Sequence, residues 1–481
     1  MVCDVGGKML DKIISILPEI PLLCGMVHLC ILYLLSNEKA KTYAATARFW
    51  LLVSVFLTTI CYYRGTDTIL AAANSYTLLF ILCANIALYI IMILSATWFS
   101  SLKRTGGRYY ILLLLSSGSI NMMLNTENFC VYGFCFAFLT VIGGALYGIH
   151  TLQQQINLKK YIITSALVLV ILAIGLIYVG QIIGAENLTT EQMQLFLRAY
   201  SRKLSTILFV ISSIVPLLYA LGIFPFHIMA EEKACCSILP VSHYFMLFLP
   251  IVYWGCLIEI NQTVYPVYGE ICKKIYQALA LISVIWGAIG ANTRKNLHGV
   301  YAYSSIYHFG IILFLISLGQ ERAIFAGFIY LLCYLLVMAN LYAIFYNLKT
   351  HGQYISDIAS LSGLAQTRSY TTGALMISLF SLIGVPPLIG FLGQMNMADE
   401  LLGNANYIAV GIIFAALLIL SKAYLDIMKV IYFAPKTKSF DSENKSILFY
   451  TSINTIAIMT FAFNPFNMIE KIKDMFYVIF L

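Results

Sequence analysis

The sequence predicts an all-α integral membrane protein with about fourteen transmembrane helices, arranged as two inverted five-helix repeats that each contain a broken helix. Three observations lead to this fold class. Hydrophobic residues make up 61% of the 481 residues and charged residues only 10%, which is more apolar surface than one soluble core can bury. Apolar stretches of the ~20 residues that a bilayer requires recur along the chain. Two of them, far apart in the sequence, carry similar prolines and glycines.

The expected spans follow one another with only short polar stretches between them, so we expect a single membrane domain. The first apolar stretch contains Glu19 and lacks a small-residue cleavage site, which indicates a membrane span rather than a signal peptide. The fourteen expected spans are 13–35, 45–64, 76–100, 109–125, 129–150, 161–184, 204–224, 238–258, 274–291, 301–318, 322–346, 372–392, 406–434 and 446–463.

Near-regular spacing aligns the five spans within 109–258 with the five within 274–434. Residues 1–108 then form an N-terminal group of three helices, and residues 446–481 form a C-terminal helix and tail. Because each repeat has an odd number of spans, the second repeat is expected to be inverted relative to the first. Two half-channels can form one path across the membrane in such an arrangement.

The broken helices are predicted at Gly222-Ile-Phe-Pro-Phe-His227 and at Gly384-Val-Pro-Pro-Leu-Ile-Gly-Phe-Leu-Gly-Gln394. Pro225, Pro386 and Pro387 each lack a backbone N–H, and a proline inside a helix clashes with the preceding turn. A membrane tolerates the freed carbonyls only where protein or a water-filled cavity satisfies them, and transporters place ion sites at such breaks. The two breaks predict an ion path in mid-membrane, with ordinary proline kinks as the alternative.

The distribution of Lys and Arg predicts the orientation of the chain. The loops after odd-numbered spans carry sixteen of the 29 basic residues, and the loops after even-numbered spans carry seven. The positive-inside bias therefore places the odd loops on the cytoplasmic or equivalent side. No soluble domain gathers basic residues among aromatic ones, so we expect no nucleic-acid partner. The basic residues of the odd loops include Lys39, Lys41, Arg48, Lys103, Arg104, Arg108, Lys159, Lys160, Arg294, Lys295, Lys436, Lys438 and Lys445.

Cofactor motifs are missing from the sequence. The twelve cysteines form no C-x-x-C pair, and Cys235 and Cys236 are adjacent, so metal or iron–sulfur ligation is not expected. The seven histidines have no metal-ligand spacing, and no Gly-rich nucleotide loop, nucleophile elbow or pair of catalytic carboxylates is present. We expect no redox centre and no metal on this chain, so that any redox chemistry belongs to a partner.

An ordered set of short motifs resembles the antiporter-like membrane subunits of NADH:quinone oxidoreductase (respiratory complex I), most closely subunit N, the counterpart of mitochondrial NADH dehydrogenase subunit 2. The match runs in order along nearly the whole chain. The motifs are Leu17-Pro-Glu-Ile20, Leu158-Lys-Lys-Tyr161, Phe224-Pro-Phe-His227, Pro240-Val241, Ala302-Tyr-Ser-Ser-Ile306, His308-Phe-Gly310, Tyr330-Leu-Leu-Cys-Tyr334, Leu361-Ser-Gly-Leu364, Ser381-Leu-Ile-Gly-Val-Pro-Pro387, Gly390-Phe-Leu-Gly393, Tyr424-Leu425 and Lys429-Val-Ile-Tyr-Phe433.

This resemblance implies a function and partners. A subunit of this kind couples electron transfer to quinone with proton transport across the membrane, beside other antiporter-like subunits in the lipid bilayer. NADH, FMN, the iron–sulfur clusters and quinone are expected on partner subunits. The implied location is a bacterial or mitochondrial inner membrane. The motif match also implies a family role for Lys160, Tyr303, Ser304 and His308, and Gly390 and Gln394 are further motif positions.

The sequence departs from the family where charge matters most. The resemblance implies a glutamate in span 5 and lysines in spans 7, 8 and 12 as a mid-membrane row that carries protons. All four charges are absent here, and a proton relay needs groups that bind and release protons within reach of one another. The corresponding residues are Cys135, Ala220, Pro250 and Gln394, while His298 replaces a loop lysine and Asp426 replaces an arginine of span 13.

A rebuilt relay is one hypothesis for this chain. His243 precedes Pro250 by seven residues, which in a regular helix is two turns, so both would lie on one face of span 8. Imidazole titrates near neutral pH and could carry the proton. The remaining candidates for the proton path are Lys160, His227, His308, Lys422 and Asp426.

Each candidate also has a structural explanation. The two span histidines, His243 and His308, are equally compatible with helix packing, and His227 with a local brace for the backbone near Pro225. Lys160 at a span edge is compatible with snorkelling to the headgroups, and Lys422 with a charge pair to Asp426 four residues later. Residues 231–233, of sequence Glu-Glu-Lys, are expected to form a solvated cluster in a loop.

Three functions therefore stay open at this point. The first is a proton-translocating subunit of NADH:quinone oxidoreductase. The second is a structural subunit of the same complex that no longer conducts protons, which the four lost charges favour. The third is a subunit of a cation/proton antiporter, which shares the broken helices.

Overall fold

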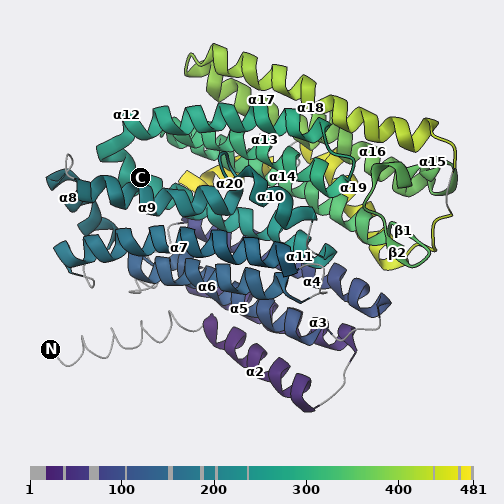
Figure 1. Ribbon diagram of the computed structural model, residues 1–481, viewed down its shortest axis with the longest axis horizontal. Helices are drawn as coiled ribbons and strands as arrows, with labels where there is room; N and C mark the ends of the chain where they lie inside the picture. The colour runs from purple at the N-terminus through teal and green to yellow at the C-terminus, as the bar shows by residue number, and fades with distance from the viewer. Residues whose placement is uncertain are drawn as a thin grey trace. The chain divides into compact units, whose positions relative to one another are not determined.

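The computed structural model describes residues 18–35, 39–63, 75–102, 106–149, 155–184, 189–200, 204–235, 238–436, 439–463 and 467–477. Residues 13–17 of the first expected span, with Leu17, lie outside the described residues, as do Lys103, Arg104, Cys236 and Lys438. The described chain is almost entirely helical (Figure 1), and nine of its helices are long and apolar enough to cross a membrane. The all-α membrane fold class is confirmed, whereas the count of fourteen spans and the inversion of the repeats stay predictions.

The chain divides into two compact units. The first comprises the described residues up to Ala220 together with Phe248–Val267, and within it α5 packs against α6 and α2 packs against α3 and α5. Its helices are α2 (Glu19–Leu35), α3 (Ala40–Tyr63), α4 (Ser75–Ser101), α5 (Gly107–Asn125), α6 (Phe129–Tyr147), α7 (Gln155–Ile183), α8 (Thr190–Ala199), α9 (Leu204–Leu221) and the first part of α12 (Leu249–Asn292).

The second unit comprises Leu221–Leu247 and Tyr268–Tyr477, and its central element is α14, which packs against α13, α16, α17 and α19. The predicted domain boundaries stay a prediction. The elements of this unit are α10 (His227–Cys235), α11 (Leu239–His243), η3 (Tyr244–Phe248), the rest of α12, α13 (Leu297–Ser317), α14 (Glu321–Asn347), β1 (Lys349–Thr350), β2 (Gln353–Tyr354), η4 (Ile358–Leu361), α15 (Leu364–Thr367), α16 (Ser369–Ile383), α17 (Ile389–Gly403), α18 (Tyr407–Phe433), α19 (Lys445–Thr460), η5 (Phe461–Phe463) and α20 (Met468–Tyr477).

Helix breaks lie at both proline motifs and share one backbone device. A glycine with positive φ ends the first helix of each pair, Gly222 after α9 with φ 70° and Gly384 after α16 with φ 86°. Glycine enters this left-handed region without the penalty that a Cβ brings. Pro225 and Pro387 follow in cis peptide bonds, and the chain resumes as α10 and α17.

The expected connection between spans 8 and 9 is mostly helical. Helix α12 runs through it, contains Pro266 and is interrupted at Tyr268, where φ is −115° and ψ is 16°. Because Tyr268 is not helical, α12 consists of two helices that meet at a kink. Proline removes one hydrogen bond and bends a helix.

The same-face argument for His243 and Pro250 also fails, because the helix is not regular between them. Residues Tyr244–Phe248 form the π-helical turn η3, whose hydrogen bonds span five residues instead of four. Seven residues across such a turn are no longer two α-helical turns.

A further difference is that α8 and α20 form in segments where no helix was expected. Both helices are short and amphipathic, so neither has the apolar length of a span.

Candidate functional site

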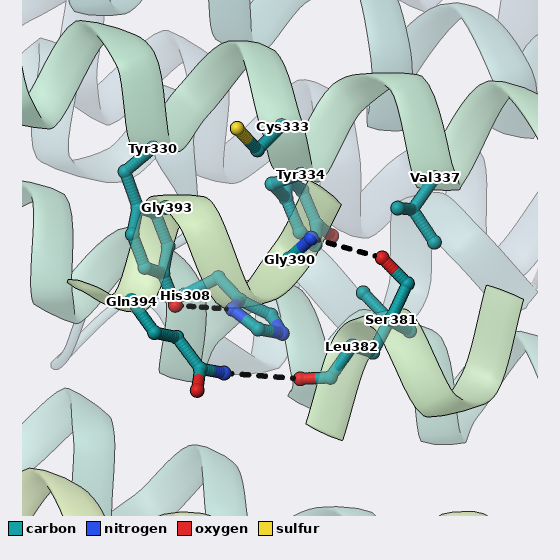
Figure 2. Close-up of a pocket in the computed structure, with 10 residues that line it drawn as sticks. All are labelled: His308, Tyr330, Cys333, Tyr334, Val337, Ser381, Leu382, Gly390, Gly393 and Gln394. Atoms are coloured by element: carbon teal, nitrogen blue, oxygen red, sulfur yellow. Dashed lines mark hydrogen bonds between the residues drawn. The ribbon is translucent and has the colours of Figure 1, made fainter. Parts of the chain in front are cut away.

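A small polar pocket lies in the second unit at the break between α16 and α17. Figure 2 shows it bordered by side chains of α13, α14, α16 and α17. The pocket leaves about 10 Å³ for the centre of a water molecule, which is roughly what one water needs. Its lining residues are His308, Tyr330, Cys333, Tyr334, Val337, Ser381, Leu382, Gly390, Gly393 and Gln394.

His308 contributes an imidazole to the lining of this pocket. Helix α13 holds it fully inside the protein, with 3% of its surface exposed. Its Nδ1 lies 2.8 Å from the Tyr330 hydroxyl, as the dashed line in Figure 2 marks, and its ring lies 4.7 Å from the Tyr334 ring. Within the described residues its Nε2 has no hydrogen-bond partner. One nitrogen is therefore oriented by a phenol while the other is left for a water or a proton.

Gln394 satisfies the carbonyls that the break frees. Its amide Nε2 donates to the Ile383 carbonyl at 3.2 Å and, more weakly, to the Leu382 carbonyl at 3.5 Å. Gly390 approaches α16 so closely that an added Cβ would lie 1.7 Å from the Ser381 carbonyl oxygen, and its N–H donates to the Ser381 hydroxyl at 3.0 Å. The two motif residues Gly390 and Gln394 thus maintain the shape of the break.

Serines of α13 pair with tyrosines of two other helices near this pocket. The Ser305 hydroxyl lies 2.7 Å from the Tyr334 hydroxyl of α14, and the Ser304 hydroxyl bonds to the Tyr424 hydroxyl of α18. Both serines are buried. Sequence reasoning assigned Ser304 only by its motif, and the paired tyrosines were not identified as partners.

His243 forms a second histidine–tyrosine site. Its ring stacks on the Tyr342 ring with centroids 4.6 Å apart and planes 6° apart, and neither of its ring nitrogens has a hydrogen-bond partner among the described residues. The Tyr342 hydroxyl lies 2.8 Å from the Ser242 hydroxyl, and the His298 ring lies 6.5 Å from the Tyr342 ring. His298, which replaces a lysine of the family pattern, therefore borders the same aromatic group as His243.

Arg294 anchors the start of α13. Its Nη2 donates to Glu231 Oε2 at 2.6 Å and to the Tyr303 hydroxyl at 2.8 Å. Burial opposes the charge of Arg294, but the ion pair with Glu231 outweighs burial and raises the arginine pKa. The expected solvated loop at 231–233 is wrong, because these residues belong to α10 and Lys233 is buried there with its ammonium 5.9 Å from the Phe245 ring. A long apolar stem lets lysine pack inward.

The break between α9 and α10 is packed differently. The Phe224 N–H donates to the Ser283 hydroxyl of α12 at 3.1 Å, which satisfies one freed backbone group. His227 begins α10, and its ring is parallel to the Phe224 ring and lies 5.3 Å from the Trp286 ring. An aromatic stack surrounds this break next to Pro225.

The first unit contains a buried polar network that sequence reasoning missed. The Glu19 carboxyl of α2 lies against α5 beside Gly118, and the Asn85 amide of α4 donates to Asn121 Oδ1 of α5 at 3.4 Å. The Ser117 hydroxyl donates to Asn85 Oδ1 at 2.7 Å. Cys135 of α6 is buried. Asparagines inside apolar spans were the available signal, since such residues rarely face lipid.

The three remaining candidates have exposed side chains in the described structure. Lys160 is exposed near the start of α7, while Lys422 and Asp426 lie on the exposed face of α18. The described chain contains no ion pair between Lys422 and Asp426. Their assignment to a proton path stays a prediction.

A family model described as "NADH:quinone oxidoreductase/Mrp antiporter, TM" matches residues 138–419, more than half of the chain. The chain belongs to this family. It is a multi-pass membrane protein, and the resemblance to subunit N is confirmed by its relatives.

Two relatives are named NADH-quinone oxidoreductase subunit N. The protein of Paramagnetospirillum magneticum is 26% identical over 257 residues, and the match spans 53% of each chain, about half of that relative. The protein of Pelagibacter ubique is 25% identical over 368 residues, covering 76% of this chain and 77% of the relative.

Three solved structures share the fold of this family member. A chain of respiratory complex I from Thermus thermophilus with bound aureothin matches with a TM-score of 0.79 and 18% identity, covering 94% of this chain and 98% of that chain. A chain of the membrane-bound sulfane sulfur reductase, an archaeal respiratory membrane complex, matches with a TM-score of 0.83 and 17% identity, covering 97% and 98% of the two chains. A chain of the Mrp complex from Dietzia sp. DQ12-45-1b matches with a TM-score of 0.80 and 14% identity, covering 98% of each chain. Because different kinds of membrane complex share this fold, the fold alone does not select a function.

The four positions where the family resemblance implies charges can now be placed. In the first unit, Cys135 and Pro250 are buried within α6 and α12, and Ala220 lies near the end of α9. In the second unit, Gln394 caps the broken helix with its neutral amide. In this antiporter-family chain, the family resemblance implies a lysine with a titratable ammonium at this position. Gln394 has a neutral amide there instead, which caps backbone carbonyls.

Proposed function

We propose that this chain is a membrane subunit of proton-translocating NADH:quinone oxidoreductase, similar to subunit N, in which electron transfer to quinone is coupled to proton transport. The structural observation that carries the proposal is His308, a buried imidazole with one unpartnered nitrogen beside room for one water at a helix break. Intramembrane ionisable residues are costly and occur mainly on ion and proton pathways.

The side chains around His308 supply the elements of a relay. Neutral imidazole can accept a proton at Nε2 while Nδ1 exchanges a proton with the Tyr330 hydroxyl at 2.8 Å. The Ser305–Tyr334 pair offers a second hydroxyl route next to the same ring. Gln394 cannot titrate, so its part is to hold the break open by capping its carbonyls. Proton transfer through these groups replaces the lysine of the family pattern.

His243 is the second titratable group of the proposed relay. It is fully buried, both ring nitrogens are unpartnered among the described residues, and a π-helical turn follows it directly. π-Turns within helices occur frequently at functional sites. In the first unit, the partly buried Glu19 carboxyl beside α5 supplies the acid that Cys135 does not.

The cofactors and partners follow from the same proposal. NADH, FMN, the iron–sulfur clusters and quinone belong to other subunits, and this chain contributes proton transfer without a redox centre. Its neighbours are other membrane subunits of the complex, including antiporter-like ones. The membrane is a bacterial or mitochondrial inner membrane.

One alternative has a specific observation in its favour. Neutral residues at Cys135, Ala220, Pro250 and Gln394 favour a structural subunit that keeps helix packing without conducting protons. The cation/proton antiporter stays the third candidate, because the Mrp complex shares the fold. Co-purification of the chain with NADH-oxidising, iron–sulfur-containing subunits would exclude the antiporter.

The deciding experiment measures protons moved per electron pair in sealed vesicles of the native membrane. We expect His308→Phe together with His243→Phe to lower this ratio while quinone reduction continues, and Tyr330→Phe to lower it less. His28→Phe is the matched control, since this histidine lies on the exposed face of α2 and its Nδ1 accepts a hydrogen bond from Trp50 Nε1 at 3.3 Å. An unchanged ratio in the double variant, with the complex intact, would establish the structural role instead.

A further inference from the structure

Helix α18 packs by one face only. Its buried residues, which include Ile413, Leu420 and Tyr424, lie toward the rest of the second unit, where α18 packs against α13, α16 and α17. Exposed residues recur on the opposite face at spacings of three and four, so they form one stripe along the helix. This α18 stripe consists of Gly411, Ala415, Leu418, Lys422, Leu425, Asp426 and Lys429.

Two charges of the α18 stripe lie deep in the span. Helix α18 has 27 residues and is therefore about 40 Å long, against a hydrocarbon thickness of about 30 Å. Lys422 stands just past the midpoint of the helix at Leu420, and Asp426 follows one turn later. A lysine snorkels to the headgroups only from near a helix end, and the shorter aspartate side chain reaches less far. Both charges therefore lie at the depth of the lipid tails.

These two charges need a cover that lipid cannot provide. Among the described residues, neither Lys422 nor Asp426 forms a hydrogen bond or an ion pair. Charged residues inside a membrane almost always face protein or water, because lipid tails do not solvate them. The other exposed helices α7 and α19 obey this rule, since residues 161–183 and 446–460 contain no Asp, Glu, Lys or Arg. The α18 stripe is therefore not a lipid-facing surface.

Small residues in the same stripe indicate what covers it. A Cβ added to Gly411 would meet no atom within 4 Å, so no contact within the described chain requires a glycine there. Glycine inside a helix is unfavourable relative to alanine. Gly411 and the exposed Ala415 lie one turn apart, and small residues at this spacing let a second helix approach closely. This observation is independent of the two charges and points to the same face.

We propose that the α18 stripe docks a transmembrane helix of a different membrane subunit, with a carboxylate of that helix opposite Lys422. The stripe carries two lysines and one aspartate, so its charge favours an acidic partner. A lipid headgroup does not reach this depth. A second copy related by a two-fold axis along the membrane normal would place Lys422 beside Lys422, where like charges repel. The docking needs only neighbouring membrane subunits and does not depend on proton transfer at His308.

The first test identifies the occupant by photo-crosslinking in the intact purified complex. A benzophenone amino acid replaces Leu418, which is 75% exposed in the middle of the stripe. The same probe at Leu167, 61% exposed on the apolar face of α7, measures labelling of lipid. We expect the Leu418 probe to form an adduct with another membrane subunit, within a helix that contains Asp or Glu. An adduct with lipid alone, or with a second copy of this chain, would overturn the proposal.

The second test removes the charge at Lys422. Lys422→Met is more apolar, so it makes insertion of α18 easier while it leaves the partner's carboxylate unpaired. We expect the variant chain to dissociate from the complex in native electrophoresis, at detergent concentrations that the native complex withstands. Lys445→Met, the same substitution at an exposed lysine where α19 begins, is the matched control and should stay bound.

An exchange variant separates docking from a charge pair within α18. Lys422→Asp combined with Asp426→Lys retains both charges on the helix and reverses their order, so the partner's carboxylate would meet an aspartate. We expect this variant to dissociate like Lys422→Met. Retention equal to that of the native chain would show that the two charges need only each other, and the docking would be refuted.

The proton-to-electron ratio keeps this proposal separate from the proposed function. If Lys422→Met stays in the complex and lowers the ratio, Lys422 belongs to a proton path and the docking is refuted. His308→Phe tests the proposed function in a complex whose α18 is unchanged. An unchanged ratio in that variant would count against the relay and leave the crosslink at Leu418 as evidence for the docked helix.

Discussion

The two helix breaks of this protein have the same backbone conformation and differ in the side chains that surround them. At α9–α10 the His227 ring stacks on the Phe224 ring and meets the Trp286 ring edge-on, and the Ser283 hydroxyl accepts a hydrogen bond from the freed N–H. At α16–α17 the Gln394 amide covers the carbonyls and leaves room for about one water. A broken membrane helix is therefore not by itself an ion site, because the side chains around the break decide whether water can enter.

The largest effect is expected from filling the closest approach at the second break. In Gly390→Ala the new Cβ would lie 1.7 Å from the Ser381 carbonyl, a backbone atom that cannot rotate away. Overpacking of this kind costs ~1–3 kcal/mol or more. We expect a clear fall in the thermal midpoint of the purified complex and little assembled chain in the membrane.

Gly373→Ala is the matched control, because this glycine of α16 has no atom within 4 Å of an added Cβ. Alanine there should be neutral or slightly stabilising, since glycine inside a helix costs about 0.5–1 kcal/mol relative to alanine. Equal stability of the two variants would show that α16 and α17 approach less closely than described.

The second expected effect concerns the cap of the same break. Gln394→Leu leaves the Leu382 and Ile383 carbonyls without their amide donor, and an unsatisfied buried acceptor costs ~1–3 kcal/mol. We expect a lower thermal midpoint than in the native complex. Gln394→Lys keeps a donor for these carbonyls and should be more stable than Gln394→Leu.

The Gln394→Lys variant also tests whether His308 titrates at the second break. An ammonium in the His308 pocket would disfavour a second positive charge on the imidazole, because like charges raise each other's cost of ionisation at short range. We expect the pH profile of proton pumping to shift in Gln394→Lys. A profile identical to that of the native complex would mean that His308 does not titrate during turnover.

The fold was predictable where the residues of a single segment determine its backbone structure. Apolar stretches predicted the spans, and Gly222, Pro225, Gly384 and Pro387 marked both interruptions, because backbone geometry depends on local residues. The π turn after His243 was not predictable, since no residue type of Tyr244–Phe248 demands it.

The candidate site was predictable only in part, because its contacts join residues distant in sequence. His308 and Gln394 were found by motif, but the Tyr330 partner of His308 and the carbonyl-capping part of Gln394 depend on how α13, α14, α16 and α17 pack. The packing of Glu19 against Gly118 likewise links α2 to α5 across about a hundred residues of chain. Single-helix patterns contain no information on such pairings.

The smallest effect is expected from a substitution of His227, which tests most directly whether the two helix breaks differ in proton transfer. His227→Phe should preserve the ring contacts with Phe224 and Trp286. If no proton passes through the aromatic rings around the first break, this variant should leave the proton-to-electron ratio unchanged. His308→Phe, an identical substitution beside the second break, should lower that ratio. Because both variants exchange one imidazole for one phenyl ring near a proline break, differences in size and apolarity cancel between them. Equal losses would mean that both breaks conduct, and that aromatic packing in the static structure does not exclude water during turnover.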